Sequence, residues 1–204
     1  MAARRFFHPA ALAATLAVAA PATAFEYSFA DGEVTGSLDT TLSIGSLWRT
    51  QGRNPGLIAI ANGGTSRDPN ADDGNLNYDK GDLVSLALTS TVDFLLKYLA
   101  FGVFARGSYL YDEAKMDKSE LGPKAIDHTA NYARLLDFYA FGKFDLAGRA
   151  LFVRAGDQVV NWGESTFIRN GISILNPVDV AKLRTPGLEL KEALSPTPML
   201  WALQ

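Results

Sequence analysis

Residues 82–111, DLVSLALTSTVDFLLKYLAFGVFARGSYLY, contain two runs of alternating apolar and polar side chains with a short interruption between them. A period of two places one set of side chains on each face of a β-strand. The stretch therefore predicts two antiparallel strands, Asp82–Phe94 and Ala100–Tyr111, joined by a tight turn at residues 95–99.

The same alternation recurs in three further segments, which are Val34–Trp48, Leu135–Asp145 and Ala150–Trp162. The connections between the five segments run long, short, long, short, and they comprise residues 49–81, 95–99, 112–134 and 146–149. Tight turns at one end of a sheet and long polar loops at the other are typical of outer-membrane β-barrels. The pattern predicts an all-β fold, an antiparallel meander that forms the N-terminal part of a transmembrane outer-membrane β-barrel.

A soluble β-sandwich would show the same alternation, with its apolar face turned to a core. The barrel is favoured because aromatic residues gather at the strand ends, as in a membrane-interface girdle. They are Trp48, Phe94, Tyr109, Tyr111, Phe144 and Trp162.

The alternation also assigns faces, with Leu86 and Leu136 among the residues expected to point outward and Thr89 inward. Six ionisable residues are expected to face the lumen: Asp39, Asp93, Arg106, Asp137, Lys143 and Arg154. Mixed charges inside a barrel form a solvated lumen, a salt-bridge network or a selectivity filter. The network is favoured over the filter, because opposite charges in a narrow space pair with one another.

The N-terminus has the features of an export signal. Arg4 and Arg5 precede an apolar run from Ala10 to Ala20, and residues 22–24, ATA, form a small-x-small cleavage site. Residues 1–24 are therefore predicted to be a signal peptide, and a cytoplasmic amphipathic helix is the weaker alternative. No other stretch is long and apolar enough for a transmembrane helix. The predicted location is the outer membrane of a Gram-negative cell.

Residues 25–204 are predicted to be a partial barrel. Five strands cannot close in lipid, so the chain is interpreted as a fragment of a larger barrel, with closure by oligomerisation as the alternative. Residues 163–198 break the alternation with several prolines but keep apolar residues. This irregular segment is predicted either to fold into the barrel mouth as a plug or constriction, or to pack on its neighbours alone. A short helix after Pro177 and a sixth strand beginning at Pro198 are expected within and after it.

The sequence offers little for catalysis. Asp73, Asn75, Asn77 and Asp79 alternate as calcium ligands do, but Tyr78 stands where an EF-hand requires glycine, so a polar turn is favoured. His128 lies in a polar loop with no identifiable catalytic partner. The chain has no cysteine. We therefore expect no catalytic residue, no cofactor and no metal site, and hence a protein that is not an enzyme. The net charge is −3 and no basic cluster is present, so no nucleic-acid partner is expected.

Four motifs resemble a known family: RAGDQVVNWGEST at 154–166, NPVD at 176–179, PGLELKEA at 186–193 and DGNLNYDKGD at 73–82. They resemble the domain-of-unknown-function family 1302 of proteobacterial outer-membrane proteins. The family-like residues singled out are Asp157, Trp162, Glu164, Asn176 and Asp179. The resemblance implies an outer-membrane barrel, usually much longer than this chain, encoded near genes for the degradation of hydrophobic compounds and for efflux-type transporters. It implies no established activity and no catalytic residues.

The favoured function is an outer-membrane channel or porin-like protein for uptake or export of hydrophobic organic compounds, and its substrate class rests on the resemblance alone. The first alternative is a structural or assembly partner of an envelope transport machine. A barrel enzyme is the third and least favoured hypothesis. The expected partners are outer-membrane lipid, a hydrophobic small molecule and envelope transport proteins.

Overall fold

The computed structural model describes residues 14–19, 23–68, 73–118, 121–160 and 175–204, and for residues 14–19, 23, 73 and 74 it describes the backbone alone. The strands are β1 Ala14–Ala19, β2 Thr23–Phe29, β3 Val34–Trp48, β4 Leu83–Tyr98, β5 Phe101–Asp112, β6 Asn131–Leu146, β7 Arg149–Gln158 and β8 Thr197–Leu203. The α-helical turns are α1 Asp73–Leu76, α2 Glu113–Met116, α3 Pro123–Thr129 and α4 Leu190–Ala193. The 3₁₀ turns are η1 Ala30–Gly32, η2 Pro55–Leu57, η3 Ile60–Asn62 and η4 Lys182–Arg184.

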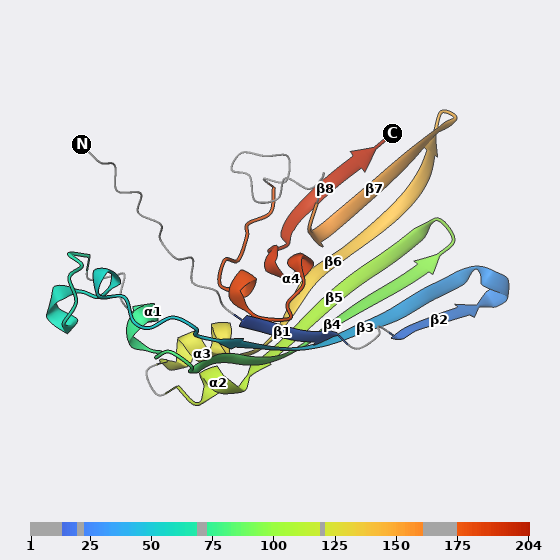
Figure 1. Cartoon of the computed structure of the whole chain (residues 1–204). Coiled ribbons are helices and arrows are strands. Elements are labelled where there is room, and N and C mark those ends of the chain that lie inside the picture. The colour runs from blue at the N-terminus through green and yellow to red at the C-terminus, as the bar shows by residue number, and fades with distance from the viewer. Residues whose placement is uncertain (1–13, 20–22, 69–72, 119–120, 161–174) are drawn as a thin grey trace, which may run out of the picture.

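The strands form one 8-stranded sheet in the order β1-β3-β4-β5-β6-β7-β8, and β2 also pairs with β3. Every pairing is antiparallel, and each strand from β3 onward is bonded to the next in the chain. The prediction of an all-β antiparallel meander is confirmed. Within the described residues the sheet is open, with β8 paired only to β7, and it curves around α4 (Figure 1).

The strand bounds lie close to the predicted ones. β3 has the predicted limits, and β5 is displaced by one residue. β4 continues four residues beyond the predicted end, and β6 begins four residues before the predicted start. β8 lies where the sixth strand was expected to begin. β7 ends at Gln158, four residues before the predicted end at Trp162, which itself lies outside the described residues.

Two strands were not predicted. β2 pairs with residues 34–40 of β3, and β1 pairs with residues 43–48 of the same strand. Tyr27 of β2 lies over Gly36, and its hydroxyl donates to the carbonyl of Leu95 at 3.4 Å. All of β1 and the start of β2 belong to residues 1–24, whose cleavage stays a prediction.

The short turns are tighter than expected. Leu99 and Ala100 alone join β4 to β5, and Ala147 and Gly148 alone join β6 to β7. Leu99, Ala147 and Gly148 have φ values of 50°, 56° and 77°. Positive φ in a two-residue hairpin matches the right-handed twist of the flanking strands. Because the two-residue turn fixes the β4–β5 register, Thr89 lies opposite Leu110, and the odd-numbered residues of β4 share one face with the even-numbered residues of β5.

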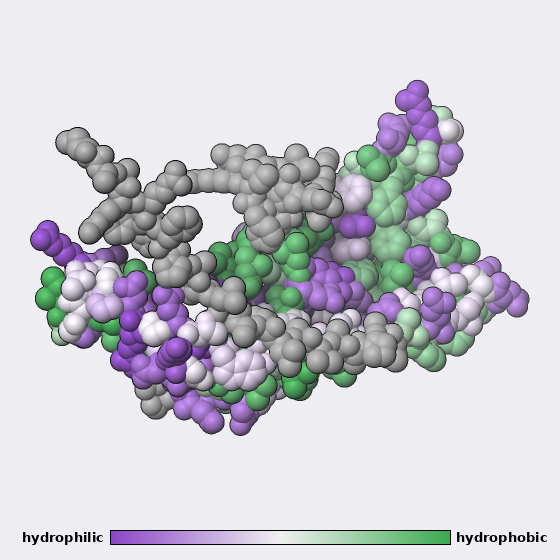
Figure 2. Space-filling model, viewed as in Figure 1, coloured by the Kyte–Doolittle hydropathy of each residue, from purple (hydrophilic) through white to green (hydrophobic). Residues whose placement is uncertain are grey.

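The two faces of the sheet differ sharply in exposure. Leu42, Ile44 and Leu88 are 45–49% exposed, whereas Ser85 and Thr89 on the opposite parity are at most 3% exposed. We call the first the apolar face and the second the polar face. In the view of Figure 2, hydrophobic and hydrophilic surface lie side by side over the β6–β8 part of the sheet. A sheet packed in a soluble sandwich would have the reverse distribution.

The predicted outward position of Leu136 is wrong. Leu136 is 6% exposed, whereas its neighbour Leu135 is 65% exposed. The register shifts between Ala105 and Gly107 of β5, where β6 contributes an extra residue. Such a β-bulge reverses the parity of the strand on one side of it, and strict alternation cannot reveal it.

Candidate functional site

Residues 175–196, which we call the inner segment, lie within the curve of the sheet (Figure 1). Val178 and Leu194 form an antiparallel bridge that brings the two arms of the segment together. Asp179 N donates to Ala193 O and Ser195 N donates to Pro177 O, both at 2.8 Å. The segment is therefore a closed loop with α4 and η4 in it, rather than an extended connection.

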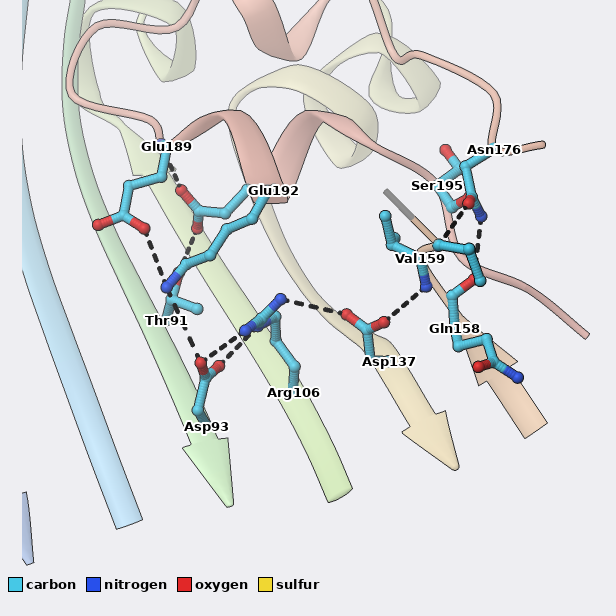
Figure 3. Close-up of polar contacts among 12 residues, drawn as sticks. Thr91, Asp93, Arg106, Asp137, Gln158, Val159, Asn176, Glu189, Glu192 and Ser195 are labelled. Atoms are coloured by element: carbon cyan, nitrogen blue, oxygen red, sulfur yellow. Dashed lines mark hydrogen bonds and ion pairs between the residues drawn. The ribbon is translucent and has the colours of Figure 1, made fainter. Parts of the chain in front are cut away.

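Asn176 fixes the loop to the end of β7. Its side chain is buried, its Oδ1 accepts from Val160 N at 2.9 Å, and its Nδ2 donates to Gln158 O at 2.9 Å and to Ser195 O at 3.0 Å. One amide thus joins β7 to both arms of the inner segment (Figure 3). The family-like residue Asn176 has a structural role at the base of this loop.

Glu192 fixes α4 to the polar face. Its Oε1 accepts from the hydroxyl of Thr91 on β4 and from that of Ser108 on β5, the latter at 3.0 Å. Its Oε2 accepts from Glu189 N at 2.8 Å and completes a capping box. Glu192 is 2% exposed, so both carboxylate oxygens exchange water for protein donors.

A third contact fixes the loop to β3. A Cβ on Gly45 would lie 2.5 Å from the carbonyl carbon of Pro186, so only glycine permits this approach. The inner segment therefore reaches across the polar face from β7 to β3.

An ionic network lies beside α4 on the polar face (Figure 3). Arg106 donates to both oxygens of Asp93, at 2.6 and 2.7 Å, and to Asp137 at 3.3 Å. Asp137 also accepts from Val159 N at 2.8 Å, and Lys191 Nζ of α4 lies 3.8 Å from Asp93. Three of the six predicted lumen-facing residues thus form one network that connects β4, β5 and β6 with the inner segment.

The other three predicted lumen-facing residues lie outside that network. Asp39 accepts from Ser37 Oγ at 3.2 Å and lies opposite Asp93 in the β3–β4 register. Lys143 is exposed near the turn of β6 and β7. Arg154 contacts aromatic rings rather than carboxylates.

The remaining family-like residues are dispersed. Asp157 is exposed on β7, opposite Phe138 and Pro198. Asp179 Oδ1 accepts from Ala181 N at 3.1 Å, where η4 follows instead of the helix expected directly after Pro177. The position of Trp162 and Glu164 lies outside the described residues.

Lys182 of η4 is buried between α4 and Tyr132 of β6. Its Nζ donates to the Glu192 carbonyl at 3.0 Å and lies over the Tyr132 ring. Burial lowers the pKa of Lys182 below its ordinary value, and the positive charge of Arg134 lowers it further. This lysine contributes to the packing of the inner segment, and nothing in the sequence pattern pointed to it.

The loop residues considered for chemistry make other contacts. His128 Nδ1 lies 2.9 Å from Arg134 Nη2. Asn75 Oδ1 accepts from Arg49 at 2.8 Å, and Asp79 pairs with Arg53 at 2.8 Å. Among the described residues, no group of three or more histidine, aspartate or glutamate side chains is arranged to hold a metal ion.

Within the same described part of the chain, none of the helices has the length and hydropathy needed to cross a membrane.

The features described so far, from the hairpins of the sheet to the inner segment, are distributed along most of the chain. A model of the family described as "Protein of unknown function (DUF1302)" matches residues 6–203. The chain belongs to this family. Neither a curated protein nor a solved structure matches it. The resemblance found in the motifs is therefore confirmed at the level of the family, which carries no assigned activity.

Proposed function

We propose that the protein is an outer-membrane β-barrel channel whose polar face lines a passive path and whose inner segment narrows it. The observation that supports this proposal most directly is the exposure of the apolar face. Leu42, Ile44 and Leu88 are about half exposed in mid-strand, while Ser85 and Thr89 on the polar face are at most 3% exposed. A membrane protein of this kind turns apolar side chains to lipid and polar ones to the lumen.

The exposed apolar face is too extensive for a soluble surface. Large apolar side chains are exposed on every strand from β2 to β8 except β7, and they include Phe25, Phe29, Tyr98, Phe101, Phe138, Phe144 and Leu200. Monomeric soluble proteins rarely expose contiguous apolar patches of this kind. Lipid contact supplies a partner, and aromatic residues near the short turns would lie at a membrane interface.

In this proposal the free edges of the sheet pair with further strands, either of the same polypeptide or of a second copy. Unpaired edge groups in hydrocarbon cost several kcal/mol each, so the barrel must close. The path inside is then bounded by the polar face, and the inner segment occupies part of its cross-section. The proposed cargo is a hydrophobic organic compound, an assignment that comes from family resemblance.

Replacement of Leu42 by arginine tests the lipid-facing assignment. Leu42 is 47% exposed at the middle of β3, so a charge there would be desolvated at a cost of roughly 2–4 kcal/mol near the bilayer midplane. We expect the folding yield in lipid vesicles, measured by protease protection and circular dichroism, to fall severalfold.

Ser37→Arg is the matched control. Ser37 lies on the polar face of the same strand, and its hydroxyl contacts Asp39, which can pair with a new guanidinium. Thr89 is a poorer control because it is only 3% exposed, so an arginine there would have to displace its neighbours. Equal yields for the two variants would show that the apolar face does not contact lipid.

The proposal also requires export, so residues 1–24 should be absent from the mature protein. The sequence ATA at 22–24 follows an apolar core of suitable length. Mass spectrometry of the N-terminal peptide from isolated outer membranes is expected to begin at Phe25. Recovery of a peptide that spans residues 20–28 would contradict cleavage at this site.

The second candidate is a structural or assembly partner in the envelope. The observation that favours it is the filling of the polar face, where Arg106 is fully paired and Glu192 is buried. A channel and a scaffold differ in single-channel conductance of the full-length protein in planar bilayers. Insertion without conductance would favour the scaffold.

A further inference from the structure

Five aromatic rings form a continuous row on the polar face, between the ionic network and the short turns. Successive centroids lie 5.2, 6.3, 5.9 and 5.6 Å apart. The row consists of Phe104 on β5, Tyr139 and Phe141 on β6, Phe152 on β7 and Trp201 on β8. All five side chains are half-buried, so their remaining surface faces the interior of the curve. We call them the aromatic row.

The rings are held in place by the sheet. A Cβ on Gly102 would overlap the ring of Phe141, so glycine lets that ring lie flat across β5. Trp201 Nε1 donates to Gln158 Oε1 at 2.8 Å, and Gln158 Nε2 donates to Met199 O at 2.9 Å. A rigid apolar surface binds a planar ligand without a large ordering cost.

Arg154 lies among these rings, and it has no anionic partner within the part of the chain that the structure describes. Its guanidinium carbon is 4.4 Å from the Tyr139 centroid, 5.1 Å from that of Trp201 and 5.9 Å from that of Phe152. Its Nε is buried and has no hydrogen-bond acceptor, and no carboxylate of the described residues pairs with the side chain. Arg106, one layer away, is paired with two aspartates.

The contrast between Arg154 and Arg106 indicates the kind of ligand that Arg154 would bind. Cation–π contacts offset only part of the cost of removing a guanidinium from water, and a buried N–H without an acceptor adds to that cost. An anion that presents oxygen atoms to Arg154 would satisfy both demands. The flat rings beside it would contact the apolar part of the same molecule, since aromatic surfaces prefer stacked or edge contacts.

We propose that the aromatic row and Arg154 bind an aromatic or polycyclic carboxylate, with its rings on the row and its carboxylate on Arg154. The inference deepens the proposed function, on which it rests for the role of the polar face as the wall of a path. A neutral hydrocarbon would leave Arg154 unpaired, and a cation would be repelled by it.

Isothermal titration calorimetry of the purified full-length protein in detergent tests the site, with 2-naphthoate and the uncharged 2-naphthalenemethanol as probes and detergent alone as the blank. We expect naphthoate to bind about tenfold more tightly than the alcohol, because a hydrogen bond to a charged group contributes on that scale. Arg154→Gln should abolish this preference, and Arg154→Lys should retain part of it.

Tyr139 and Phe138 provide a matched pair for the rings, because they are neighbours on opposite faces of β6. Phe138 is 51% exposed on the apolar face. Tyr139→Leu should weaken the binding of both probes about threefold to tenfold, while Phe138→Leu leaves both unchanged. If Arg154→Gln does not fold, Arg154→Lys and Tyr139→Leu decide the outcome.

Equal affinity of the wild-type protein for the two probes, or a preference that survives in Arg154→Gln, would overturn the site. The measurement does not require conduction. A protein that prefers naphthoate but never conducts would refute the channel and leave the binding site intact.

Discussion

Asn176→Leu is expected to destabilise the protein strongly, because this one buried side chain serves three backbone groups that are buried or part-buried. The substitution leaves Val160 N, Gln158 O and Ser195 O without their partner. Each buried group that loses its hydrogen bond costs roughly 1–3 kcal/mol. We expect the free energy of unfolding, measured by urea titration in lipid vesicles, to fall by the sum of these effects.

The same variant should release the inner segment. Trypsin cleaves after lysine and arginine. This loop contains buried Lys182 and two more accessible sites, Arg184 and Lys191. We expect cleavage at these two residues in Asn176→Leu under conditions in which the wild-type loop is resistant. Asn131→Leu, an exposed position at the start of β6, is the control and should match the wild type. A stability and cleavage pattern unchanged in Asn176→Leu would show that the loop is held elsewhere.

The strands could be predicted from the sequence because the alternation of apolar and polar residues is a local property of an extended chain. Alternation places Leu42 and Ser43 on opposite faces wherever the chain is extended, and no distant contact is needed. The β6 bulge is a tertiary feature, because the pairing of Arg106 with both Asp93 and Asp137 accompanies an extra residue in the neighbouring strand. The sequence around Leu136 has no glycine or proline that would indicate a bulge.

The site was harder to predict than the sheet because its contacts join residues far apart in the sequence. Glu192 and Thr91 are separated by 101 positions, and Glu192 resembles any surface carboxylate at the start of a helical turn. The expected packing of the irregular segment on the strands could be inferred from its apolar content. The residues that hold it, Gly45 and Asn176, become identifiable only when the fold places them together.

The aromatic row shows the same limit. Arg154 was assigned to the lumen by parity, but the pattern within one strand does not show which residues of four neighbouring strands lie at the same level of the sheet. Arg154 was therefore grouped with the other ionisable residues expected in the lumen, whereas its neighbours in the structure are the aromatic rings of Tyr139 and Trp201. The register between neighbouring strands decides which inward residues lie side by side, and it places these five rings next to one another.

Shortening the inner segment is the most direct test of its role in the proposed channel. Val178 and Leu194 already form an antiparallel bridge, and Asp179 N donates to Ala193 O, so Asn-Gly can replace residues 180–192 as a two-residue turn. The shortened loop keeps the Asn176 contacts with β7 and Ser195. The Asp93–Arg106–Asp137 pairs also remain, because all three residues belong to the sheet.

We expect this variant to insert as the wild type does and to conduct severalfold more in planar bilayers, since the loop that crosses the polar face from β7 to β3 is gone. The control removes residues 56–64 of the long connection after β3 and replaces them with Gly-Gly, because Pro55 O and Thr65 N already lie 2.7 Å apart. That deletion does not touch the polar face and should leave conductance unchanged. If the inner deletion also conducts like the wild type, the loop does not narrow the path, and the polar groups of Glu192, Thr91 and Ser108 serve the stability of the sheet alone.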